Sequence, residues 1–188
     1  MPAAHGHRRT PRLVLRRWTD ADREPFAAIN RDPKVMATLG PPLSRVQSDA
    51  FVDRIEACFD ERGWGLWCVE RTAEPGCIGY VGLSPVPDGL PFAPAVEIGW
   101  RLASAHWGLG YATEAARVVL ADAFGPLGLD EVVSMTAVVN TRSRAVMERI
   151  GLVRDETGDF EHPKVPVGDR LRPHVLYRLR ADRYRAGS

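Results

Sequence analysis

The fold of this chain is decided by the segment HWGLGYATEA, residues 106–115. It follows a strand-like stretch, residues 96–102, and leads into an apolar run at residues 116–120. Two glycines separated by one residue therefore open a predicted helix. The first turn of a helix leaves backbone N–H groups without partners, and the helix dipole attracts anions to that end. Because glycine lacks a Cβ, a phosphate can approach those groups closely, so the segment predicts a phosphate-binding loop.

Three kinds of phosphate loop compete for this segment. A Walker A loop requires a Gly-Lys-Ser/Thr ending, which is missing here. A dinucleotide fingerprint requires a third glycine where Thr113 stands, and Asp130 precedes the next strand instead of ending it. The pyrophosphate loop of acyl-CoA-dependent N-acetyltransferases remains, and so does an ordinary strand-to-helix turn that binds nothing.

The composition is that of one ordinary globular domain. The chain has 188 residues, of which 45% are hydrophobic and 26% charged, and a formal net charge of +1. A near-neutral balance predicts no nucleic-acid partner. No signal peptide or membrane span is recognised, so we expect a cytoplasmic protein without a membrane partner. Cys58, Cys68 and Cys77 form no ligand cluster, which predicts buried thiols and no metal site.

The hydrophobic pattern predicts an α/β domain with the element order βααβββαβαββ and no domain boundary between residues 1 and 188. Residues 1–10 are expected to be a flexible segment. The expected helices are 19–30, 44–62, 112–124 and 141–150. The expected strands are 13–15, 64–69, 77–83, 96–102 and 132–139, followed by two strands around a long loop within 153–180.

Further motifs agree with the loop in order and spacing. They are RLVLR at 12–16, EIGW at 97–100, NTRSRAVMERIGL at 140–152 and HVLYRL at 174–179. Together these segments resemble the GNAT superfamily of N-acetyltransferases, and most closely the subgroup that includes the ribosomal-protein N-terminal acetyltransferases. The resemblance implies a twisted, mostly antiparallel sheet of about seven strands that splays at a central parallel pair.

The resemblance also implies acetyl-CoA as co-substrate and no metal. The loop would hold the CoA pyrophosphate on main-chain amides, and the pantetheine arm would pair with the strand before it. Trp107 departs from the arginine or glutamine of the family pattern, which we expect to alter packing more than binding. The implied CoA-contacting residues are Ile98, Trp100, Leu102, Trp107, Gly108, Leu109, Gly110, Tyr111, Ala112, Thr113, Asn140, Ser143 and Met147.

Acetyl transfer to an amine requires a base, because most amines are protonated at neutral pH. Glu97 is the candidate, and many relatives carry a glutamate at this strand. Strand alternation places it on the opposite sheet face from Val96 and Ile98. If that face is the splayed cleft, desolvation raises its pKa toward a useful range. The alternative is a surface carboxylate paired with Arg101 or another arginine.

The departing CoA thiolate requires a proton, which many family members supply from a tyrosine. This chain has Met147 there, and a thioether cannot donate a proton. Ser143 lies one helical turn earlier on the same face and is the replacement we favour. Ser143 and Asn140 could equally cap the helix. Further candidates for proton transfer are Tyr111, Tyr177 and His174.

The predicted function is acetyl-CoA-dependent transfer of an acetyl group, directly within a ternary complex, to a primary amine. A protein N-terminus and a small-molecule amine both fit the segments expected to line the acceptor pocket, which are 31–42, Trp64, 85–94 and 156–173. A non-catalytic acyl-CoA sensor or scaffold is the alternative that Met147 keeps open. A homodimer is common among the relatives.

Overall fold

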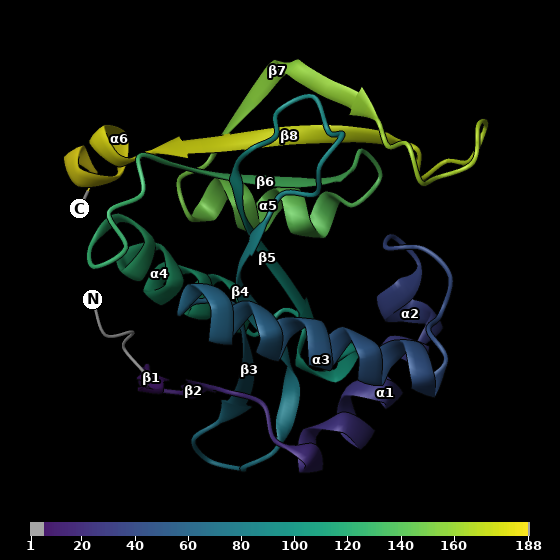
Figure 1. The fold of residues 1–188 in the computed structure, drawn as a ribbon, viewed down its shortest axis with the longest axis vertical. Helices are drawn as coiled ribbons and strands as arrows, with labels where there is room; N and C mark the ends of the chain where they lie inside the picture. Colours follow the sequence, from purple (N-terminus) through teal and green to yellow (C-terminus); the bar gives the residue numbers. More distant parts are fainter. Residues whose placement is uncertain (1–5, 188) are drawn as a thin grey trace.

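Eight strands form one sheet in the order β1-β2-β3-β4-β5-β6-β8-β7 in the computed structural model, which describes residues 6–187 (Figure 1). Neighbouring strands are antiparallel except β5 and β6, which are parallel. The strands are β1 (Arg8–Arg9), β2 (Leu13–Arg16), β3 (Leu66–Arg71), β4 (Cys77–Pro85), β5 (Val96–Leu102), β6 (Glu131–Ala137), β7 (Val153–Glu161) and β8 (Pro173–Arg180).

The helices follow the cap signals of the sequence. Ser44 and Gln47 form a capping box at the start of the longest helix, which ends at Gly63 in a left-handed conformation (φ 76°). The α-helices are α1 (Arg23–Arg31), α2 (Pro33–Met36), α3 (Arg45–Arg62), α4 (Tyr111–Phe124), α5 (Thr141–Arg149) and α6 (Ala181–Ala186), with 3₁₀ turns η1 (Asp20–Asp22) and η2 (Ser104–His106).

The helices cover both faces of the sheet. Asn30 of α1 hydrogen-bonds Arg101, so α1 lies on the face that carries every second residue of β5, including Glu97 and Gly99. Arg8 stands opposite Leu15 in the sheet and pairs with Asp122 of α4, which places α4 on the other face. The main hydrophobic core contains residues of α1, α3 and α4 and extends across the sheet from β2 to β6 and β8.

The sheet splays between β5 and β6. In the described chain these strands share one paired position, Glu97 with Val133. One residue later a side chain replaces the ladder, because the Ser134 hydroxyl donates to the Ile98 carbonyl at 2.8 Å. Since parallel strands normally continue pairing, the remaining half of β5 leaves backbone groups open toward β6. The predicted splay at the central parallel pair is confirmed.

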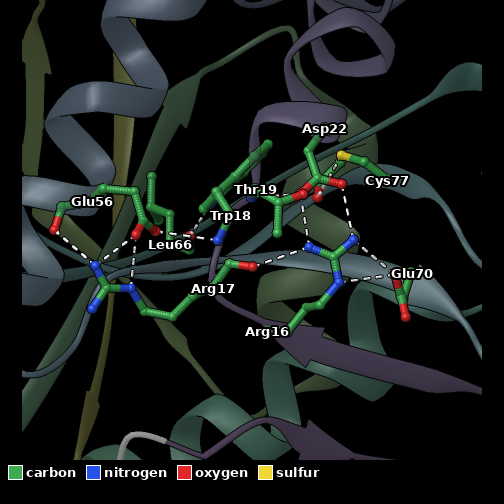
Figure 2. Close-up of polar contacts among 10 residues, drawn as sticks. Arg16, Arg17, Trp18, Thr19, Asp22, Glu56, Leu66, Glu70 and Cys77 are labelled. Atoms are coloured by element: carbon green, nitrogen blue, oxygen red, sulfur yellow. Dashed lines mark hydrogen bonds and ion pairs between the residues drawn. The ribbon is translucent and has the colours of Figure 1, made fainter.

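A buried ion pair fastens η1 to the sheet (Figure 2). The Arg16 guanidinium donates to both carboxylate oxygens of Asp22, at 2.7 and 2.9 Å, and also to Glu70 at 2.9 Å. Asp22 further accepts from the backbone and hydroxyl of Thr19, both at 2.8 Å. These donors hold the pKa of Asp22 below its usual value although burial opposes them.

The structure corrects some sequence-based expectations. Residues 8–10 of the expected flexible segment are ordered, because Arg8 and Arg9 pair with β2, while residues 1–5 lie outside the described residues. The two-residue strand β1 raises the strand number from about seven to eight. The first predicted helix begins as a 3₁₀ turn, and Pro33 starts α2, where its missing N–H costs nothing. Helix α6 was not expected.

Removal of the Asp22 carboxylate tests the ion pair. Asp22→Ala leaves a half-buried guanidinium without its main partner, so we expect the free energy of unfolding to fall by about 3 kcal/mol. Asp20→Ala is the matched control, because the Asp20 side chain is 97% exposed. Urea denaturation of both variants measures the difference, and equal stabilities would show that the Arg16–Asp22 pair contributes nothing.

Candidate active site

The glycine loop presents a row of unused backbone donors at the start of α4. Gly108 and Gly110 have left-handed backbones, with φ of 76° and 81°. The first amide to find an acceptor is that of Glu114, which donates to the Gly110 carbonyl at 3.0 Å. The six amides of residues 108–113 have no acceptor among the described residues. Such an arrangement is a binding site for an anion.

Arg12, the residue before β2, holds this loop in place. Its guanidinium donates to the Leu109 carbonyl at 3.0 Å and to Glu114 at 2.7 Å, and it stacks 4.7 Å from the centre of the Tyr111 ring. The Thr10 hydroxyl donates to the same Glu114 carboxylate at 2.5 Å. The Glu114 carboxylate in the first turn of α4 is therefore held by two residues that precede β2, and Arg12 neutralises its charge.

A pocket of about 1390 Å³ extends from this loop along β5 to α2 and α5. Ten of the residues predicted to contact CoA line it, while Ile98, Leu109 and Met147 do not, and neither does Glu97. The predicted residues in the lining are Trp100, Leu102, Trp107, Gly108, Gly110, Tyr111, Ala112, Thr113, Asn140 and Ser143.

Three arginines of α4 and α5 add positive charge to the pocket. Arg117, Arg142 and Arg149 line it, and none forms an ion pair with a described carboxylate. The Arg142 guanidinium stacks 4.6 Å from the centre of the Trp107 ring. These arginines were not among the residues predicted from the sequence, although all three follow the glycine loop on the two helices next to it. Their charge suits a ligand with several phosphates.

The open edge of β5 offers one free pair of backbone groups. The Ile98 carbonyl accepts from Ser134, and the Leu102 carbonyl accepts from the Trp107 indole at 2.8 Å. In a strand, the backbone groups of every second residue face the same neighbouring strand. The N–H and C=O of Trp100 therefore face β6 across the gap, as the Ile98 and Leu102 carbonyls do. The N–H and C=O of Trp100 therefore have no partner among the described residues, whereas the Leu102 carbonyl already accepts from Trp107.

Glu97 lies at the point where β5 and β6 separate. It is half-buried, faces the same side of the sheet as Ser84 and forms no ion pair with a described residue. Burial raises its pKa to about 7, while the nearby Met135 amide acts in the opposite direction. The alternative of a carboxylate paired with Arg101 is not what the structure shows, because Arg101 contacts Asn30 instead.

Ser143 and Asn140 stand on the opposite side of the gap from β5. The Trp100 indole donates to the Ser143 hydroxyl at 3.2 Å across the gap. Asn140 caps α5, because its carbonyl accepts from the Ser143 amide at 3.3 Å and its NH₂ group donates to Thr136 at 2.9 Å. The capping role considered for Asn140 is therefore present, and this amide also lines the pocket.

The remaining proton-transfer candidates have other partners. Tyr177 is 1% exposed and donates to Glu148 at 3.0 Å, and it lies outside the pocket lining. His174 packs against Phe160 and His162, also outside the lining. Met147 is 1% exposed and belongs to the main core. A tyrosine could not replace Met147 there without displacing core side chains.

Comparisons with known proteins agree with this geometry. A family model described as "Acetyltransferase (GNAT) domain" matches residues 12–153. The chain belongs to the GNAT acetyltransferase family. Similar proteins include the FsC-acetyl coenzyme A-N(2)-transacetylase of Aspergillus fumigatus, 33% identical over 166 residues that cover 85% of this chain and 70% of that protein.

Solved structures of this family have the same fold. An acetyltransferase from Agrobacterium tumefaciens is 30% identical, with a TM-score of 0.76 over 95% of this chain and 96% of that one. A GNAT acetyltransferase from Bacillus anthracis is 23% identical, with a TM-score of 0.77 over 94% and 99%. This GNAT chain is an acetyltransferase and uses acetyl-CoA as co-substrate. None of its described helices is long and apolar enough to cross a membrane.

The glycine loop predicts a selective loss of CoA binding in Gly110→Val. A β-branched residue is strained at φ 81°, and a shift of this residue moves the neighbouring amides. We expect the Kd for CoA, measured by calorimetry, to rise at least tenfold. Gly128→Val is the control, since Gly128 is left-handed (φ 63°) beyond the far end of α4. Unchanged affinity in Gly110→Val would refute the phosphate assignment.

The pKa of Glu97 can be tested without a substrate. A carboxyl group whose pKa is about 7 when folded and about 4.3 when unfolded binds its proton more tightly in the native state. Its contribution to stability is present at low pH and is lost as the pH rises from about 4 to about 7. Glu97→Gln removes this loss, so its stability relative to the wild type should increase between pH 5 and pH 8 in urea denaturation. A constant difference would mean an ordinary pKa.

Proposed function

We propose that this GNAT enzyme transfers the acetyl group directly from acetyl-CoA to a primary amine within a ternary complex. The observation that supports this proposal is the position of Glu97. It is a half-buried carboxyl group with a pKa of about 7, and it lies where β5 and β6 separate. The unpaired amides of residues 108–113 follow the other end of β5. The proposed base and the proposed anchor for CoA therefore lie near opposite ends of the same strand.

The chain's own groups suffice to hold CoA. The loop amides and Arg142 would take the phosphates, and the free backbone groups of Trp100 would pair with the pantetheine arm. Bound acetyl-CoA supplies a thioester carbonyl for attack by an amine. The β5–β6 gap fixes the line along which that thioester lies.

Glu97 would receive the proton of the acceptor amine, directly or through a water molecule. A base with a pKa near 7 is about half ionised at neutral pH, which favours proton transfer under these conditions. Its carboxylate is free for this task, because no cation among the described residues pairs with it.

Ser143 is the proposed donor to the departing CoA sulfur. Its hydroxyl oxygen accepts from the Trp100 indole, and its own hydrogen has no acceptor among the described residues. That hydrogen is therefore available to a ligand in the gap. The fixed indole orients the hydroxyl, so a weak acid is placed where it can form a hydrogen bond to the sulfur.

Direct transfer is favoured over an acetylated enzyme because the pocket lining contains no cysteine. Cys68 and Cys77 are buried beside Asp22, and burial raises the pKa of Cys58. Buried thiols with raised pKa values are poor nucleophiles.

The class of amine is proposed from the relatives. The Aspergillus relative is named for transfer to N2 of FsC, which supports a small-molecule amine. A structure described as a ribosomal-protein-serine acetyltransferase from Vibrio cholerae shares the fold at 17% identity. The proposal therefore includes protein N-terminal amines beside small molecules.

The pH dependence of turnover tests the role of Glu97. With saturating acetyl-CoA and a panel of amines and peptides, we expect kcat/KM to rise through an apparent pKa near 7. Glu97→Gln should lower the rate about 100-fold and remove that limb, because the base is absent. Glu61→Gln, at an exposed position of α3, is the control. A Glu97→Gln enzyme with the wild-type profile would remove Glu97 as the base.

A further inference from the structure

On the sheet face opposite α4, Glu97, Gly99 and Arg101 of β5 lie beside their partners Ser84, Gly82 and Tyr80 on β4. A Cβ built on Gly99 would meet no atom within 4 Å. Gly99 therefore leaves open space between the positions of a carboxyl group and a guanidinium group on the same strand.

Arg101 is a cation without a compensating anion. Its Nη1 donates to the Asn30 side-chain oxygen at 2.6 Å, and no described carboxylate pairs with it. Asn30 is neutral and fully buried, and its NH₂ group donates to the Ser48 hydroxyl at 2.9 Å. Arg101 Nε is the one buried side-chain nitrogen or oxygen of the described residues that lacks a partner.

The free side of this guanidinium reaches the pocket. Arg101 is half-buried and belongs to the pocket lining. Its Nη2 has no acceptor among the described residues, yet it is not buried as Nε is. The rings of Phe51 and Tyr80 lie 5.6 and 5.7 Å from the guanidinium carbon and fix its position. A rigid donor therefore points at space open to a ligand.

Arg101 is separated from the CoA-binding groups by the sheet itself. Trp100 and Leu102, which contact Ser143 and Trp107, alternate with it and face α4 and α5. Lys34 of α2 is a second cation in the pocket lining and forms no ion pair with a described carboxylate. The lining on the side away from α4 therefore carries two cations, Arg101 and Lys34.

We propose that the acceptor is an amine that also carries an anionic group, a carboxylate or a phosphate, with the amine at Glu97 and the anion at Arg101. This inference rests on the proposed transfer to an amine and names the substrate class. A guanidinium group binds both anions through charge-assisted hydrogen bonds. An anionic group on the substrate explains why no described carboxylate of the chain pairs with Arg101.

The test uses matched pairs of amines that differ in the anion. They are 6-aminohexanoate and hexylamine, 8-aminooctanoate and octylamine, and 6-aminohexyl phosphate and 6-aminohexan-1-ol, whose chains can span four residues of an extended strand. We expect kcat/KM of the wild-type enzyme to favour the anionic member of at least one pair tenfold or more, and the pair that responds distinguishes carboxylate from phosphate. Equal use of both members of every pair would overturn the inference.

Variants at Arg101 assign the preference to this residue. Arg101→Gln should abolish it by raising KM for the anionic amine, while KM for acetyl-CoA stays within twofold. Arg101→Lys should keep part of it, and Arg185→Gln, at an exposed position of α6, should keep all of it. An equal loss of acetyl-CoA binding in Arg101→Gln would assign Arg101 to CoA and overturn the proposal. Arg101→Lys and the wild-type comparison decide the matter if Arg101→Gln does not fold.

A binding measurement separates this inference from the proposed function. 6-Acetamidohexanoate, a product analogue, should bind the CoA complex of the wild type at least tenfold more tightly than N-hexylacetamide, and Arg101→Gln should remove the difference. No acetylation of any amine in the presence of tight CoA binding would refute the proposed function. Equal binding of the two amides would refute the anionic acceptor, whatever the turnover.

Discussion

The loss of pairing between β5 and β6 is the constraint on which the rest of this molecule depends. The parallel ladder holds one pair, Glu97 with Val133, and a serine hydroxyl ends it at Ile98. Backbone groups beyond that point would be costly if they were buried without partners. The fold leaves them along a pocket instead, so an interruption in the sheet becomes a binding edge. Glu97 stands at its closed end, and desolvation there gives the carboxyl group its raised pKa.

Two long-range contacts keep the opening in shape. Arg12 joins the first long strand to the glycine loop through Leu109 and Glu114, almost 100 residues later in the chain. The Arg16–Asp22 pair fixes η1, and with it α1, on the sheet face that carries Arg101 (Figure 2). Both arginines act mainly as positioning groups, since their charges are neutralised by neighbouring carboxylates. Arg101 differs from them because its neighbour is the neutral Asn30.

Local signals in the sequence were sufficient for the elements around the site. The capping residues Ser44 and Gly63 bound α3, and the β5 prediction of 96–102 matches the structure residue for residue. Element ends were missed where tertiary contacts decide. Arg8 and Arg9 form a strand because β2 and Asp122 receive them, and such partners are invisible in a local pattern. At the site, strand alternation correctly placed Glu97 on the sheet face opposite to Val96 and Ile98. It gave no information on whether a cation would pair with the Glu97 carboxylate.

By itself, the sequence determined the α/β element order, the glycine loop before α4 and the strand that carries Glu97, because caps, glycines and alternation act over a few residues. Only the tertiary structure decided which groups remain unpaired. The freedom of the Trp100 backbone depends on β6, the burial of Met147 depends on the core, and the unmatched charge of Arg101 depends on α1. Partners in these interactions lie far apart in the chain, and their energies depend on the burial that folding creates.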